Sequence, residues 1–333
     1  MNIRRYVSRT AVFAVLVGAA IINPLPRPAA HAASTTNVSI ALNWIKNVEF
    51  AGIWAAQEKG WWSQAGLQVS VRSYDDGYQD PVLLVGAGKY QFGFQDGASL
   101  ILGRAAKVPV KAVWASGETS PFAFITMPKS GITSPKDFKG KRIGYQSHEK
   151  YVLDAMLNAV GLTESDVSPV VVQYDPTVLM AGKVDAYLAY LTNEPIELAQ
   201  KYHVNVNIIP ASAYGYNFYS DVLFTTDNTI KSNPALVQKV VSIIDKGWKY
   251  ALAHPQEIAN YVVPKLDPTD SVSQQMEEMK ALGKLASLPN APTGSMTAAR
   301  WQAGVNLLLK YKQIKAPVAV GDVFTTQFLG ATH

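Results

Sequence analysis

The 333-residue chain contains no cysteine. Disulfides are therefore excluded, and an exported protein of this sequence must rely on a sizeable core for stability. A lipid anchor on an N-terminal Cys is excluded as well. The chain also lacks a Gly-rich phosphate loop and a Cys/His metal spacing, so we expect neither a metal nor a cofactor.

Long uncharged apolar runs are missing after the N-terminal segment. The single such run covers residues 11–22, with three Arg residues before it and a Pro-rich stretch and Ala30-His31-Ala32 after it. This layout predicts a secretory signal peptide over residues 1–33, cleaved after Ala32 or Ala33. A retained membrane anchor is the alternative, but a spanning helix needs about 20 apolar residues.

Excess charge of one sign is missing from the mature chain. The formal charge is +5, but residues 1–33 carry four Arg and no acid, which leaves 26 basic against 25 acidic side chains. Nothing in this balance indicates a basic nucleic-acid face, so we expect no nucleic-acid partner. With an export signal and no lipid anchor, the expected location is the periplasm.

Short strand patterns and helical patterns alternate from residue 38 to residue 209. We expect strands near residues 38–42, 67–73, 90–94, 108–115, 122–127, 170–173, 185–190 and 206–209. Helices are expected at 50–59, 81–87, 98–106, 149–160 and 196–202, and then at 234–253, 256–263, 271–285 and 297–311. This alternation predicts an α/β fold around mostly parallel sheets, whose ligands bind beyond the carboxyl ends of the strands.

Three stretches carry a family resemblance. They are Leu42-Asn43-Trp44 with Phe50-Ala51-Gly52 and the residues up to Trp62, Ser134-Pro135-Lys136-Asp137-Phe138-Lys139-Gly140, and Thr192-Asn193-Glu194-Pro195. Together they resemble the substrate-binding proteins of ABC importers related to the thiamine-pyrimidine synthesis family. The last motif is similar to the members that bind thiamine-precursor pyrimidines or riboflavin.

The resemblance implies a type II periplasmic-binding-protein fold with two lobes, each a mostly parallel sheet flanked by helices. Lobe 1 would comprise residues 34–120 and 223–333, and lobe 2 residues 121–222. Two crossing strands near 120–124 and 222–226 would form the hinge. The resemblance also implies a small ligand trapped between the lobes and an ABC permease in the inner membrane as partner, and we expect a monomer.

The candidate ligand contacts in and near the first motif are Trp44, Asn43 and Asn47. Trp44 follows a strand in a polar loop, so it either stacks on a heteroaromatic ring or closes the end of the core. Asn43 and Asn47 supply amides, although Asn is also ordinary in turns. Asp96 and Glu118 are further candidates, because Asp96 follows a strand and Glu118 lies near the first crossing.

Glu194 and Asn193 open a helix ahead of Pro195. The Glu194 carboxylate could accept paired N–H bonds from an aminopyrimidine or simply interact with the helix dipole, and Asn193 is either a helix cap or a polar contact. His148 lies at another helix start, as a contact or a structural residue. Tyr216 or Tyr219 would give a second aromatic wall.

The sequence therefore predicts a non-enzymatic solute-binding protein for a thiamine-type pyrimidine. Riboflavin is the nearest alternative ligand, and a sulfonate-type anion is another. A secreted pyrimidine-metabolising enzyme is the alternative of a different class, although the eukaryotic pyrimidine synthases that resemble this fold use a Cys-rich motif that this chain lacks. A sensory protein that reports to a membrane receptor is the third class.

Overall fold

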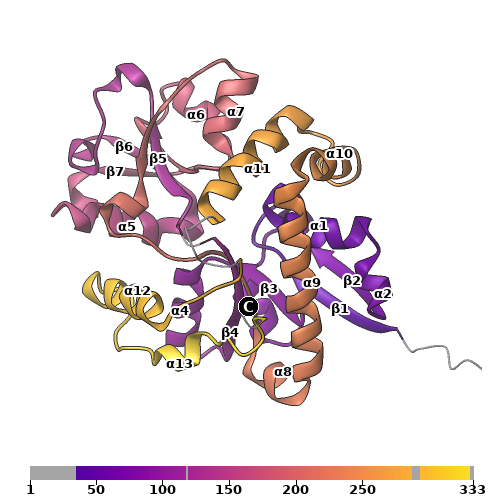
Figure 1. The fold of residues 1–333 in the computed structure, drawn as a ribbon. Coiled ribbons are helices and arrows are strands. Elements are labelled where there is room, and N and C mark those ends of the chain that lie inside the picture. Colours follow the sequence, from indigo (N-terminus) through magenta and orange to yellow (C-terminus); the bar gives the residue numbers. More distant parts are fainter. Residues whose placement is uncertain (1–34, 118, 287–292, 331–333) are drawn as a thin grey trace, which may run out of the picture. The chain divides into compact units, whose positions relative to one another are not determined.

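The computed structural model describes residues 35–117, 119–286 and 293–330. The predicted signal peptide and Glu118 lie outside these ranges. The chain from Thr35 onward forms one unit, in which the strands assemble into two five-stranded sheets. Figure 1 shows these two sheets with helices packed around each of them.

The first sheet has the strand order β2-β1-β3-β10-β4. Its strands are β1 (Thr36–Ala41), β2 (Leu67–Arg72), β3 (Phe92–Gln95), β4 (Val110–Gly117) and β10 (Ser220–Thr226). β1 pairs in parallel with β2 and β3, whereas β10 pairs antiparallel with both β3 and β4. Four strands therefore run in one direction, and β10 runs against them.

The second sheet has the same plan, with the order β7-β6-β8-β5-β9. Its strands are β5 (Phe122–Thr126), β6 (Arg142–Tyr145), β7 (Ser168–Val171), β8 (Ala186–Tyr190) and β9 (Asn207–Pro210). β6 is parallel to β7 and β8, and β5 is antiparallel to β8 and β9. In each sheet the reversed strand is the first strand in the sequence after the chain has crossed over from the other sheet.

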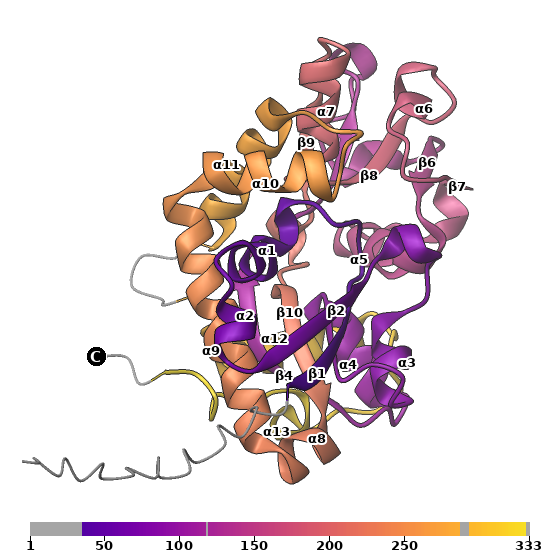
Figure 2. The same ribbon diagram turned by 90° about the vertical axis from the view of Figure 1, so that its right-hand side faces the viewer.

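Helices cover both faces of the first sheet. They are α1 (Ala51–Glu58), α2 (Trp61–Gln64), α3 (Pro81–Gly86), α4 (Gly97–Ala105), α8 (Asp227–Ser232), α9 (Pro234–Ala253), α10 (Pro255–Lys265), α11 (Val272–Ala286), α12 (Ala298–Lys310) and α13 (Val320–Val323). The long helix α9 packs along α1, and α12 and α13 pack on α4. Figure 2 shows α1 and α9 side by side next to the strands of this sheet.

Three helices accompany the second sheet: α5 (Lys150–Ala159), α6 (Thr177–Met180) and α7 (Glu194–Lys201). α11 packs against α10 and also against α7. The C-terminal helices thus return to the first sheet, as the sequence predicts, and α11 additionally reaches a helix of the second sheet.

Most predicted elements are confirmed, with ends shifted by a few residues. The helices α2, α6, α8 and α13 were not predicted, because they contain only four to six residues and so show no helical period. Among the described helices, none combines the length and the apolar composition needed to cross a bilayer.

Candidate functional site

A cavity lies beyond the carboxyl ends of strands from both sheets. It encloses about 640 Å³ of space free of atoms, including a part open to solvent. Its lining residues are Asn43, Trp44, Glu49, Tyr78, Asp80, Gln95, Asp96, Ser99, Phe122, His148, Glu149, Tyr151, Tyr174, Tyr190, Asn193 and Glu194. This is the edge at which ligands bind in open α/β sheets.

The lining is rich in carboxyl groups and aromatic rings. Five acids face the cavity, namely Glu49, Asp80, Asp96, Glu149 and Glu194, and no Lys or Arg occurs among the described lining residues. Because burial disfavours the charged form, it raises the pKa of Glu194 to about 7 and that of Glu149 to about 8. Part of the acids that line the cavity are therefore neutral near pH 7.

Glu194 is positioned by the start of α7. It is the first residue of this helix, with Pro195 next to it, and its Oε2 accepts a 2.8 Å hydrogen bond from the backbone N of Tyr190. This bond lowers the pKa of Glu194, but burial outweighs it. Asn193 lies at the N-cap position without a capping bond from its side chain. Because Asn193 lines the cavity, its side-chain amide can form a hydrogen bond with a ligand there.

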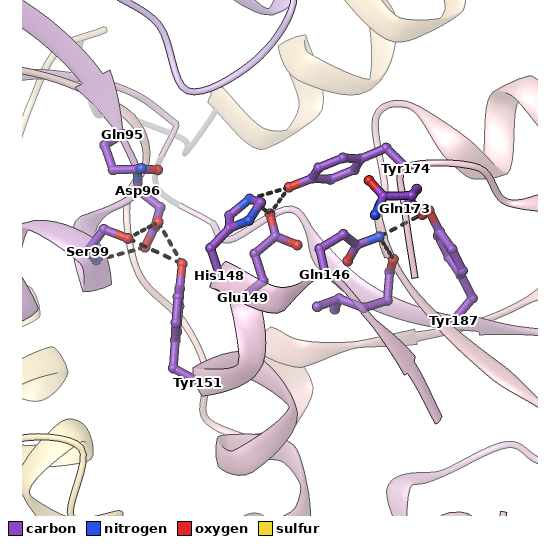
Figure 3. A network of polar contacts seen from close by, with 11 residues as sticks. Gln95, Asp96, Ser99, Gln146, His148, Glu149, Tyr151, Gln173, Tyr174 and Tyr187 are labelled. Carbon is purple, nitrogen blue, oxygen red and sulfur yellow. Dashed lines mark hydrogen bonds and ion pairs between the residues drawn. The ribbon is translucent and has the colours of Figure 1, made fainter. Parts of the chain in front are cut away.

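Asp96 lines the cavity, but its oxygens are already engaged. Oδ1 accepts from the backbone N of Ala98 and Ser99, at 2.9 and 3.1 Å, which caps α4. Oδ2 accepts from Ser99 Oγ at 2.7 Å and from Tyr151 Oη at 2.9 Å, as Figure 3 shows. Asp96 is therefore a helix cap that also ties α4 to α5, which leaves little capacity for a ligand.

His148 belongs to a small network at the start of α5. The Tyr174 hydroxyl donates to Glu149 Oε1 at 2.8 Å and lies 2.6 Å from His148 Nε2 (Figure 3). His148 Nε2 and the Tyr174 hydroxyl thus form a hydrogen bond whose donor is set by the tautomer of the imidazole. Burial lowers the pKa of His148, so the ring is neutral at pH 7.

An aromatic cluster of Trp44, Tyr74, Tyr78, His148 and Tyr174 joins loops that follow strands of both sheets. The Trp44 and Tyr174 rings meet edge to face with centroids 4.2 Å apart, and Trp44 also contacts Tyr74 at 5.2 Å. Tyr78 stacks on His148 at 4.3 Å. The predicted stacking residue Trp44 thus contacts a ring from the other sheet's side of the cavity.

Six of the ten predicted contacts line the cavity: Asn43, Trp44, Asp96, His148, Asn193 and Glu194. Asn47, Tyr216 and Tyr219 do not, and Glu118 lies outside the described residues. Asn47 is a buried cap, because its Oδ1 accepts from the backbone N of Glu49 and its carbonyl O accepts from Trp54 Nε1.

The two predicted tyrosines pack in the core instead of forming a cavity wall. Tyr216 lies among Phe122, Phe218 and Tyr151. Tyr219 packs on Trp301, and its hydroxyl accepts from the backbone N of Thr297 at 2.8 Å. The aromatic residues of the cavity come from other segments.

Sequence reasoning missed Glu49, Glu149, Tyr78, Tyr174 and Tyr190. Glu49 lies inside the first motif, and Glu149 follows the candidate His148, so both were within reach of a search for acids next to candidate residues. Tyr174 has no such signal, because its position depends on how β7 pairs with β6.

Several curated proteins are similar to most of this chain. The riboflavin-binding protein RibY of Chloroflexus aurantiacus is 27% identical over 92% of this chain and 90% of its own length. The formylaminopyrimidine-binding protein of Halalkalibacterium halodurans is 23% identical over 87% of this chain and 89% of its own length. Other relatives, which match about two thirds of the chain, are named 4-amino-5-hydroxymethyl-2-methylpyrimidine phosphate synthase.

Solved structures confirm the fold class. The alkanesulfonate-binding protein SsuA of Xanthomonas axonopodis pv. citri, bound to MOPS, aligns with a TM-score of 0.68 at 17% identity, over 89% of this chain and 100% of that one. A family model described as NMT1/THI5 like matches residues 47–258, which is more than half of the sequence. The chain therefore belongs to the NMT1/THI5-like family and has the periplasmic-binding-protein fold.

Proposed function

We propose that this protein is the solute-binding component of an ABC importer and that it captures a thiamine-type pyrimidine and delivers it unchanged to a membrane permease. The observation that carries this proposal is the cavity, which combines acids and aromatic rings at strand ends of both sheets. Residues 35–120 with 223–330 would form one lobe and residues 121–222 the other. Closure around the ligand would bend the chain at the two crossings, after β4 and after β9.

The chemistry of the cavity suits an aminopyrimidine. A flat ring can stack on Trp44, Tyr78 or Tyr174, with about 1 kcal/mol beyond the burial of area. Its amino group and ring nitrogens match Glu194 and the amides of Asn43 and Asn193, and hydrogen bonds to a carboxylate are the stronger kind. An aminopyrimidine therefore satisfies both features of the lining at once.

Riboflavin is the second candidate, because the riboflavin-binding protein RibY aligns with 92% of this chain at 27% identity. A sulfonate fits less well, since an anion would face five acids without a Lys or Arg among the described lining residues. An enzyme of pyrimidine metabolism is the alternative that the synthase names raise. Incubation with labelled ligand separates the classes, because a binding protein returns the ligand intact.

The proposal also covers location and assembly. Export by a cleaved signal peptide over residues 1–33 would place the protein in the periplasm, as a monomer and without a lipid anchor. The binding proteins with this fold include the periplasmic SsuA of Escherichia coli, which supports that location. Peptide sequencing of the mature N-terminus from a periplasmic extract tests it.

We expect Glu194→Gln to weaken binding of 4-amino-5-hydroxymethyl-2-methylpyrimidine by more than tenfold. The amide keeps an oxygen for the backbone N of Tyr190, but it loses the charge that strengthens the bond to the ligand. Isothermal titration calorimetry measures the affinity, and the melting temperature should change little. Glu197→Gln, on the same helix but outside the cavity, is the control. An unchanged affinity would remove Glu194 from the site.

Trp44→Phe should abolish most of the fluorescence change that ligand causes. Trp44 lines the cavity, and a stacked heteroaromatic ring quenches an indole. The control is Trp61→Phe, because Trp61 packs on Tyr250 and under Lys246, away from the cavity. If the Trp44 variant retains the full response and the Trp61 variant loses it, the ligand does not stack where we propose.

A further inference from the structure

Behind the cavity lies a pair of carboxyl groups that no cation accompanies. Glu49 lines the cavity and is 6% exposed, and Asp221, in β10, is 1% exposed. The two side chains hydrogen-bond to each other. Such a bond needs a proton on one of the carboxyls, because an ionised carboxylate only accepts. The pair therefore holds one shared proton and keeps one negative charge.

Each acid of the pair keeps an oxygen to which no other described residue donates. Glu49 Oε1 and Asp221 Oδ1 are both in this position, whereas Asp221 Oδ2 accepts from Ser116 Oγ at 3.3 Å. A buried acceptor that receives no hydrogen bond destabilises the fold. Asp221 also has a φ of +43°, a left-handed backbone conformation that is strained for most non-Gly residues.

The charged groups that act on this pair are all acids. Glu194 from α7 and Glu278 from α11 act on Glu49, and Asp96 from the start of α4 acts on Asp221. Glu278 is itself hydrogen-bonded to Gln274 and Gln275. No group of three or more acids and His among the described residues has the arrangement of a metal site. None of the groups that act on the pair is positively charged, so a cationic ligand would supply the charge that the pair lacks.

We propose that Glu49, backed by Asp221, is a specificity-determining residue that selects ligands with a positively charged nitrogen. The inference rests on the proposed function and adds the charge of its ligand. When the ligand enters, the amino group conjugated with its cationic ring donates a hydrogen bond to Glu49. The proton that the two carboxyls share leaves to solvent, so one positive charge replaces another.

Calorimetry with two probes tests this exchange. One probe is 4-amino-5-hydroxymethyl-2-methylpyrimidine, and the other is its ring N-methylated pyrimidinium, which is permanently charged. Titrations at pH 7.5 in buffers with different heats of ionisation give the number of protons released. We expect the pyrimidinium to bind more tightly than the neutral ring and to release about one proton.

The variants Glu49→Gln and Asp221→Asn should bind the pyrimidinium at least tenfold more weakly and release no proton. Glu257→Gln, an acid outside the cavity, serves as the control. Melting curves of each variant confirm that it is folded, and the Asp221 variant gives the same test if Glu49→Gln does not fold.

Three results would overturn the inference, and they bear differently on the proposed function. If both pyrimidines bind the wild type and Glu49→Gln equally well, without proton release, Glu49 has no selective role but the binding protein stands. Binding of riboflavin alone also leaves a binding protein, with a neutral ligand. If neither pyrimidine nor riboflavin binds, the proposed function fails together with the inference.

Discussion

The ligand-free protein is expected to melt at a progressively lower temperature as the pH rises from 5 to 8. Burial raises the pKa of Asp221 to about 6, of Glu194 to about 7 and of Glu149 to about 8, from ordinary values of 3.8 for Asp and 4.5 for Glu. Above pH 4.5 the unfolded chain releases these protons while the folded chain retains them. The stability that these three acids contribute is therefore fully present below their ordinary pKa and is lost as the pH rises through the pKa of each in the folded protein.

The expected loss is large. One pKa unit corresponds to about 1.4 kcal/mol, so Glu194 alone accounts for about 3 kcal/mol of the free energy of unfolding. Acids whose pKa is lowered, such as Asp137 and Asp185, stabilise the fold above their ordinary pKa and lose this contribution only as the pH falls below it, outside this window. The lowered pKa of His148 makes the free energy of unfolding rise with pH near 6.5. This single group opposes the three acids and does not outweigh them.

Differential scanning calorimetry of ligand-free protein at pH 5, 6, 7 and 8 measures this decline. Glu149→Gln should flatten the curve between pH 6 and 8, because the amide does not titrate. A melting temperature that stays constant or rises over this range would contradict the proposed burial of neutral acids in the cavity of the ligand-free protein.

Gly247→Ala should destabilise the fold by about 3 kcal/mol, at the upper end of the usual cost of overpacking. Gly247 lies in α9 where that helix crosses α1, and a Cβ there would lie 2.0 Å from the carbonyl O of Gly52. Since that atom belongs to the backbone of α1, the two helices would have to separate. The 3-10 helix Val48–Phe50, which holds Glu49 at the cavity, leads directly into α1.

Urea unfolding of Gly283→Ala provides the matched control. Gly283 is also inside a helix, α11, but its added Cβ would meet Leu252 Cδ2 at an ordinary 3.5 Å. Ala in a helix is better than Gly by up to about 1 kcal/mol, so this variant should be neutral or more stable. Equal effects of the two substitutions would show that the α1–α9 crossing tolerates separation.

The sequence predicted the fold in those places where local pattern is sufficient. α9 has the predicted bounds, 234–253, because Pro234 begins it and apolar residues recur at helical spacing over twenty positions. The sheets were predicted as mostly parallel, and four of five strands in each do share a direction. The positions of β5 and β10 next to the edge strands depend on pairings between residues more than sixty positions apart, which local pattern does not encode.

The site was predicted best at positions that follow a strand directly. Trp44 and Glu194 follow β1 and β8, and both line the cavity. Tyr216 and Tyr219 precede β10, and because β10 runs against its neighbours its start lies beside the ends of β3 and β4, on the cavity side of the sheet. Both rings nevertheless pack on core aromatics, Tyr216 on Phe218 and Tyr219 on Trp301, and local sequence pattern does not encode which way a side chain turns there.

The central place of β10 in the first sheet has a consequence for the order of folding. β4 is hydrogen-bonded to this sheet through β10, which follows it by about a hundred residues. The second sheet, in contrast, is built from the continuous segment 122–210. Local contacts form faster than distant ones, so this inner segment should fold first, and its completion returns the chain to the point where β10 can join β3 to β4.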